Sequence, residues 1–114
     1  MDDNLIQDSA KELPVPGMDV IKGYLKTAPQ KPGVYRMLNE KEDVLYVGKA
    51  KNIKKRIVSY TRPTGLNNRL TKMVSKTTTM IFVTTQTEAE ALLLEASLIK
   101  RFKPQYNVLL KDDK

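Results

Sequence analysis

One stretch of the sequence decides the fold: LYVGKAKNIKKRIVSY, residues 45–60. Its first residues are mostly apolar and favour a strand over 44–47. Asn52 can cap a helix that continues to about Tyr60, with Ile53 and Ile57 one turn apart on its inner face. Gly48 lies between the two elements, where the lack of a side chain relieves crowding as the strand ends. A strand that leads into a helix therefore forms the centre of the predicted fold.

A second apolar segment precedes this stretch. Residues 33–38 favour a strand, and the polar residues 39–43 join it to the strand over 44–47, so a hairpin is predicted. Further upstream, Asp19 is expected to cap a short helix that Pro29 and Pro32 end, and its apolar positions recur at helical spacing: Val20, Ile21, Tyr24 and Leu25. Residues 1–17 are polar and acidic, and predict a flexible lead-in to a folded domain over 18–111.

Two helices and a strand follow the stretch. After a loop at 63–65, Asn67 or Asn68 caps a helix with one apolar face, formed by Leu70, Met73 and Val74. Residues 77–85 are rich in β-branched side chains and favour a third strand. A capping box at 87–90 opens the last helix, which Pro104 closes. The order β-β-α-α-β-α, with an extra N-terminal helix, predicts an α+β domain with a small, mostly antiparallel three-stranded sheet.

The composition excludes several kinds of site. The chain has 114 residues, enough for one domain, and contains neither cysteine nor histidine. Disulfides, thiol nucleophiles and cysteine-ligated metals are therefore excluded, as are Ser-His-Asp triads and histidine-ligated metals. An enzyme built from this sequence has to take its general base from Asp, Glu, Lys or Tyr.

The charge is concentrated in one part of the sequence. The formal net charge is +7, and residues 44–87 contain no acidic side chain and nine basic ones: Lys49, Lys51, Lys54, Lys55, Arg56, Arg62, Arg69, Lys72 and Lys76. Such a window is typical of a surface that faces a polyanion, although a solvated basic face without a partner remains the alternative. A membrane is less favoured than nucleic acid, because no segment approaches the ~18 apolar residues of a span. Without a visible signal peptide, we expect an intracellular, cytoplasmic protein.

Glu95 is a candidate metal ligand. On a helical wheel its neighbours are apolar: Leu92, Leu98, Ile99 and Phe102. A carboxylate on an apolar face needs a cation, which is either a neighbouring Lys or Arg or a divalent metal, and the spacing leaves both open. With few other acids nearby, a metal here would be Mg²⁺ held mainly through water and substrate phosphate.

The tyrosines form a second candidate site. Tyr35 and Tyr46 lie on the two arms of the predicted hairpin, and Arg56 shares a helix face with Tyr60. Cross-strand packing alone would explain these tyrosines. However, nearby cations favour the charged form of a phenol, so Tyr46, followed by Lys49 and Arg56, is a candidate general base. Solvation of Lys49, a plain phosphate contact for Arg56 and packing for Tyr60 remain alternatives.

Several of these segments together resemble a known family. Gly33-Val34-Tyr35 and LYVGKA (45–50), the eleven-residue spacing of the two tyrosines, Arg56 ten residues beyond Tyr46, and the later glutamate resemble the GIY-YIG nuclease superfamily. The segments 31–37, 45–60 and 87–114 are similar, within it, to the N-terminal domain of the UvrC family of excinuclease subunits. This resemblance implies a GIY-YIG fold in which Gly33 and Gly48 are structural.

The resemblance also implies roles for individual residues. It makes Glu95 the ligand of Mg²⁺ or Mn²⁺ and Tyr46 the phenol that activates water, with Lys49 and Arg56 stabilising charge. Tyr35, Tyr60 and Asn107 would complete the hydrogen-bonded site. The residues expected to bind DNA through its phosphates are Lys51, Lys54, Lys55, Arg69, Lys72 and Lys76.

The implied function is a DNA endonuclease domain that makes the 3′-side incision in bacterial nucleotide excision repair. Its expected partners are damaged double-stranded DNA and, through other parts of a longer protein, the helicase subunit UvrB; the isolated domain is expected to be a monomer. Two alternatives are a basic nucleic-acid-binding module without catalysis, and a GIY-YIG nuclease with a mobile-element, restriction or stand-alone role.

Overall fold

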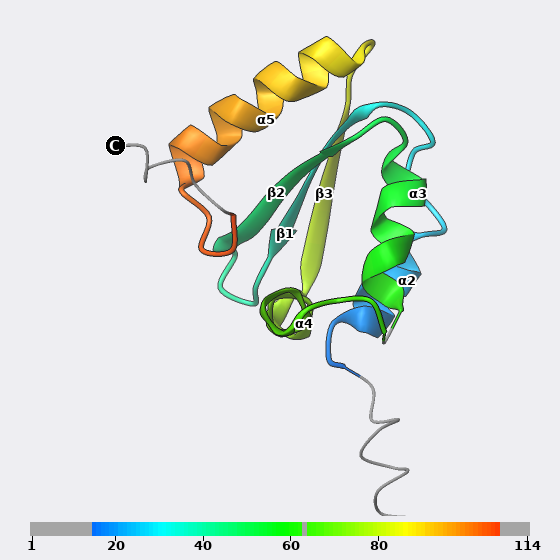
Figure 1. Ribbon diagram of the computed structural model, residues 1–114, viewed down its shortest axis with the longest axis vertical. Coiled ribbons are helices and arrows are strands. Elements are labelled where there is room, and N and C mark those ends of the chain that lie inside the picture. Colours follow the sequence, from blue (N-terminus) through cyan, green and yellow to red (C-terminus); the bar gives the residue numbers. More distant parts are fainter. Residues whose placement is uncertain (1–14, 63, 108–114) are drawn as a thin grey trace, which may run out of the picture.

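The computed structural model describes residues 15–62 and 64–107 of the chain. Within them, the helices and strands follow one another in the predicted order, and the predicted α+β class is confirmed (Figure 1). Most of the predicted lead-in over 1–17 and the end of the predicted domain lie outside the described residues. The elements are α2 (Met18–Tyr24), β1 (Gly33–Leu38), β2 (Val44–Ala50), α3 (Ile53–Val58), the 3₁₀ helix η1 (Ser59–Thr61), α4 (Asn68–Lys76), β3 (Thr79–Thr84) and α5 (Glu88–Phe102).

The three strands form one antiparallel sheet in the order β2-β1-β3, so β1 is central. The predicted hairpin is confirmed, with Tyr35 opposite Gly48 in its register. β1 has the predicted bounds, whereas β2 continues past the predicted end at Val47 to Ala50. β3 is slightly shorter than the predicted 77–85. In this sheet β2 is an edge strand, and one side of its backbone is available to other parts of the chain.

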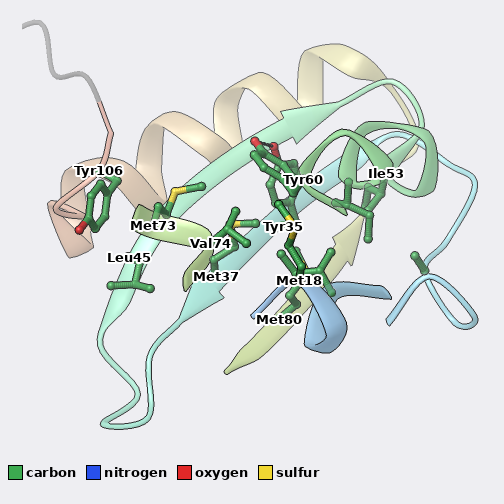
Figure 2. Packing of buried hydrophobic residues seen from close by; sticks show 13 residues of the cluster. Met18, Tyr35, Met37, Leu45, Ile53, Tyr60, Met73, Val74, Met80 and Tyr106 are labelled. Atoms are coloured by element: carbon green, nitrogen blue, oxygen red, sulfur yellow. Dashed lines mark hydrogen bonds between the residues drawn. The ribbon is translucent and has the colours of Figure 1, made fainter. Parts of the chain in front are cut away.

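Helices cover both faces of the sheet. α5 lies across one face, mainly over β2, and its Ala91 forms a small buried cluster with Val34 and Val47 (Figure 1). The larger core lies on the other face, under α2, α3, η1 and α4. Figure 2 shows Tyr35 and Tyr60 side by side in this core. Because side chains alternate along a strand, Val34 and Tyr35 belong to opposite layers.

Side chains cap three of the helices as predicted. Asn52 Oδ1 accepts a hydrogen bond of 3.0 Å from the main-chain N–H three residues further on, at the start of α3. Asn67, rather than Asn68, caps α4 in the same way at 2.8 Å, and the Thr87 hydroxyl caps α5 at 3.1 Å. These caps satisfy N–H groups that have no partner within the helix.

The predicted cap of the first helix is wrong. α2 begins at Met18, so Asp19 lies in its first turn, and Gly17 takes the N-cap position with a left-handed φ of 96°. A Cβ on Gly17 would collide with the main-chain carbonyl oxygen of Val74 on α4. The chain therefore passes α4 at a point where only glycine fits, and the helix starts directly afterwards.

The hairpin depends on the absence of a side chain at Gly48. A Cβ there would collide with the Cζ and Oη atoms of Tyr35, whose exposed fraction is 0%. A Cβ on Gly33 would likewise collide with the main-chain oxygen of Val83 on β3. Both glycines are thus structural, as the resemblance implied. The reason at Gly48 is the contact across the hairpin, because β2 does not end there.

We predict that Gly48→Ala destabilises the fold by about 1–3 kcal/mol, the range for an overpacked core, because the buried Tyr35 ring cannot move away. Urea unfolding measures the change. Gly23→Ala on α2 is the matched control, since a Cβ at Gly23 has nothing within 4 Å. It should be neutral, or stabilising by up to ~1 kcal/mol, because alanine is the better helix former. Equal losses from the two variants would contradict this account of Gly48.

Candidate active site

Three tyrosines from different elements pack together beside the sheet. Tyr35 comes from β1, Tyr46 from β2 and Tyr60 from η1, and their ring centroids are 6.0–6.5 Å apart. The hydroxyl groups of Tyr35 and Tyr60 form a buried hydrogen bond of 2.7 Å. The predicted closeness of Tyr35 and Tyr46 across the hairpin is therefore confirmed, and the structure adds Tyr60 to the pair.

Burial separates these tyrosines chemically. Tyr35 is fully buried, and burial is the main cause that raises its pKa to about 12; the neighbouring Tyr46 raises it further. Burial also raises the pKa of Tyr60 far above the ordinary value of a phenol. Both hydroxyls therefore stay protonated near neutral pH. Tyr46 is only partly buried, so its side chain can be reached from solvent.

Arg56 is held by the same cluster. Its guanidinium lies beside the Tyr35 hydroxyl, and the interaction with Tyr35 is the largest cause that raises the pKa of Arg56. Its Cζ atom lies 6.0 Å from the centre of the Tyr60 ring, which confirms that the two residues share a face. The guanidinium remains largely exposed. It is thus a fixed positive charge at the surface beside the tyrosines.

Lys49 lies on the other face of β2. In the register of the hairpin it pairs with Val34, which packs under α5, and it is the cation whose charge acts on Glu95. The sequence analysis grouped Lys49 with Tyr46, but residues three apart on a strand point to opposite faces. Lys49 therefore lies on the same face as Glu95 of α5, and Tyr46 lies on the other face with Tyr35 and Tyr60.

Glu95 is half-buried on α5. Burial raises the pKa of its carboxyl group, and the charge of Lys49 partly offsets this effect. The predicted apolar surroundings are correct for Leu98 and Ile99, which are half-buried against the sheet, but wrong for Leu92, which is 51% exposed.

A metal at Glu95 would have few protein ligands. Within residues 15–62 and 64–107, no group of three or more acidic side chains comes together that could hold an ion. One half-buried carboxylate, with water and substrate oxygens as further ligands, fits the hard, oxygen-preferring Mg²⁺. The structure thus leaves room for both interpretations of Glu95, a partner of Lys49 and a metal ligand.

Asn107 binds the outer edge of β2. Its side-chain amide donates a hydrogen bond of 2.9 Å to the carbonyl of Val47 and accepts one of 2.9 Å from the N–H of the same residue. The N–H of Tyr106 adds a bond of 3.0 Å to the carbonyl of Leu45. The segment after α5 therefore runs along the free backbone edge of β2. The bond between Tyr106 and β2 was not predicted. The only sign of it in the sequence is that Tyr106 follows Pro104, which ends the last helix.

The predicted DNA-binding residues lie on two helices and the segment before one of them. All are exposed except Lys54, which is half-buried; the others are Lys51, Lys55, Arg69, Lys72 and Lys76. On α4, Met73 and Val74 are buried, so the basic stripe opposite the apolar face is confirmed. Lys76 also lies 5.5 Å from the centre of the Tyr106 ring. No helix in the described parts of the chain is long and apolar enough to cross a membrane.

Relatives with this arrangement can be recognised by sequence. The chain is 53% identical over 114 residues to a UvrABC system protein C from Cereibacter sphaeroides, and this match covers 100% of the chain. It is 59% identical over 98 residues, 86% of the chain, to the UvrABC system protein C of Bartonella henselae. The chain spans only 18% and 15% of the length of these two relatives.

A solved structure has the same fold. The GIY-YIG N-terminal endonuclease domain of UvrC from Thermotoga maritima, bound to its catalytic divalent cation, magnesium, matches with a TM-score of 0.70 at 34% identity. The match covers 77% of the chain and 96% of that domain. A family model described as the UvrC-like GIY-YIG domain covers residues 31–108, and the tyrosine cluster, Arg56 and Glu95 all lie within it. The chain therefore belongs to the UvrC-like GIY-YIG domain family.

Proposed function

We propose that this chain is a metal-dependent DNA endonuclease domain. It hydrolyses a phosphodiester bond and makes the incision on the 3′ side of a lesion in bacterial nucleotide excision repair. The divalent cation of the Thermotoga maritima domain and the shared family support this function. The cation of this chain is Mg²⁺ or Mn²⁺.

The arrangement around β2 carries the proposal. Tyr46 on one face of this edge strand belongs to the cluster that holds Arg56, and Lys49 on the other face acts on Glu95. A phosphate at the edge of the strand is within reach of groups from both faces. Two cations and a carboxylate around one phosphate are typical of phosphoryl-transfer sites, where charge on the phosphate has to be stabilised.

The general base is Tyr46. The chain has no histidine, and burial keeps Tyr35 and Tyr60 protonated, so neither can accept a proton from water near neutral pH. The partly buried Tyr46 is the tyrosine of the cluster that water can reach. Tyr35 and Tyr60 instead pack beside Arg56, whose charge stabilises the attacked phosphate. Asn107 fixes the backbone of β2 at Val47, directly after this base.

Glu95 would hold the metal ion, and a divalent cation there would supply positive charge to stabilise the phosphate and the leaving 3′ oxygen. The single carboxylate agrees with a Mg²⁺ site that is completed by water and substrate. Lys49 lies beside the same carboxylate, where it orients Glu95 and adds a second positive charge for the phosphate.

DNA lies against the basic helices. Lys51, Lys54 and Lys55 contact its phosphates at the start of α3, and Arg69, Lys72 and Lys76 do so from α4, without reading sequence. Damaged double-stranded DNA is thus the substrate. In the longer protein, which acts in the cytoplasm, UvrB engages parts outside this chain, and the domain itself is a monomer.

The experiment that tests this function is nicking of supercoiled DNA with Mn²⁺ or Mg²⁺. Tyr46→Phe removes only one hydroxyl and should slow nicking by about 10²–10⁴-fold, the usual contribution of a general base. Glu95→Gln should abolish metal-dependent nicking while the fold is kept. Tyr24→Phe is the matched control, because the Tyr24 ring packs against Phe82 on β3 and is not one of the three clustered tyrosines, so this variant should cut like the wild type.

The outcomes separate the alternatives. Full activity of Tyr46→Phe would show that another group is the general base. Full activity of Glu95→Gln would show that Glu95 is not the metal ligand. Salt-dependent binding of DNA, without cleavage under either metal, would instead favour a non-catalytic binding module. A cut on the 5′ side of a defined lesion would contradict the proposed incision.

The raised pKa of Glu95 also predicts a change in stability with pH. Since its folded pKa lies above the ordinary 4.5, the folded state binds a proton more readily than the unfolded state, and the charged form opposes folding at neutral pH. In EDTA, Glu95→Gln should therefore raise Tm at about pH 7 by about 1–3 °C, a small shift because solvent screens the charge of a half-buried group. The gain should disappear below about pH 4, where both states are protonated.

Thermal unfolding followed by circular dichroism measures this difference. The control is Glu40→Gln in the exposed turn between β1 and β2, which should leave Tm nearly unchanged at both pH values. A lower Tm for Glu95→Gln at neutral pH would show that Lys49 already stabilises the carboxylate more than burial destabilises it.

A further inference from the structure

A second recess lies beside the tyrosine cluster. It has a volume of about 310 Å³ and lies between the end of α3, η1 and the start of α4. Arg56 and Tyr60 form part of its wall, so it is continuous with the candidate active site. Its size is at the lower end of the ~300–1,000 Å³ that is usual for small-molecule sites. The proposed general base Tyr46 and the proposed metal ligand Glu95 do not line it.

One wall of the recess is cationic. Arg62 follows η1 with an extended backbone and an exposed side chain, and it lines the recess together with Arg56. None of the described residues that line the recess is acidic. The guanidinium of Arg56 lies beside Tyr35, and those of its five N–H groups that face the recess can bind an anion together with Arg62. Two arginines without a carboxylate match the oxygens of a phosphate group.

The other wall is apolar. Leu66 and Leu70 line it, and both are half-buried. Leu70 lies in the first turn of α4, where the Asn67 cap fixes the start of the helix through a hydrogen bond of 2.8 Å. A ligand that fits both walls has an anionic part for the arginines and a less polar part for the leucines, and a nucleotide has both. Its phosphate would face the arginines, and its sugar or base would pack against the leucines.

We propose that this recess binds the nucleotide next to the scissile phosphate on the strand that is cut. Arg62 contacts the phosphate of that nucleotide, and Leu66 and Leu70 pack against its sugar or base. The inference rests on the proposed nuclease function and adds the place where the neighbouring nucleotide is held. Arg62 is thus a binding residue that fixes the register of the strand, and it takes no part in the chemistry.

The test begins with binding of a fluorescein-labelled DNA duplex by the full chain in EDTA. Arg62→Ala should weaken binding about tenfold, as for loss of one charge-assisted contact, and should lower the slope of log Kd against log salt by about one. Lys100→Ala is the control, because Lys100 is an exposed cation of α5 outside the recess; binding should change less than about twofold. Equal effects of the two variants would overturn the proposal, since they would show only the loss of a charge.

Nicking then locates the contact on the strand. Once the cut has been mapped, a neutral methylphosphonate is placed at each neighbouring phosphate in turn. At one of these positions it should raise the KM of the wild type about tenfold with little change in kcat, and it should have no further effect on Arg62→Ala. Effects of variant and methylphosphonate that multiply at every position would overturn the proposal. If the chain bound DNA through Arg62 but never nicked it, the nuclease function would fail and the nucleotide site would stand.

Discussion

The buried hydrogen bond of 2.7 Å between the hydroxyls of Tyr35 and Tyr60 joins the middle of the sheet to the segment after α3. Neither hydroxyl can reach water, so each depends on the other, and a break would leave a buried polar group without a partner. The same position of Tyr35 explains why Gly48, directly opposite, has no room for a side chain. Arg56 lies at the surface beside the same pair. The core and the charged surface are therefore built around one contact.

The second constraint is that β2 is an edge strand. Its inner side pairs with β1, and part of its outer side is covered by the segment after α5, through two hydrogen bonds between the Asn107 amide and the backbone of Val47. A side-chain amide imitates a neighbouring strand here, without extending the sheet. Edge strands are open to pairing with other chains, and this cover protects the strand at Val47. It leaves the side chains of Tyr46 and Lys49, on either side of Val47, pointing to opposite faces.

Local signals in the sequence were sufficient for most of the fold. The strand over 33–38 and the caps at Asn52 and Thr87 depend on neighbouring residues, and the structure has them as predicted. The start of α2 depends on how closely Gly17 passes another helix, which no local pattern reveals. The position of Lys49 was accessible, because the period of a strand already separates it from Tyr46. The partner of Asn107 lies 60 residues away along the chain, and only the folded structure shows it.

Burial gives the site its chemical order. Three phenols in contact would be nearly equivalent in water, but burial raises the pKa of the two inside the core, and only Tyr46 is left partly exposed at the surface. On the other face of β2, burial raises the pKa of Glu95 and so opposes the charged form of its carboxyl group. The positive charge of Lys49 favours that charged form and partly offsets the effect of burial. The charged carboxylate therefore opposes folding at neutral pH, so packing alone does not explain its place on α5.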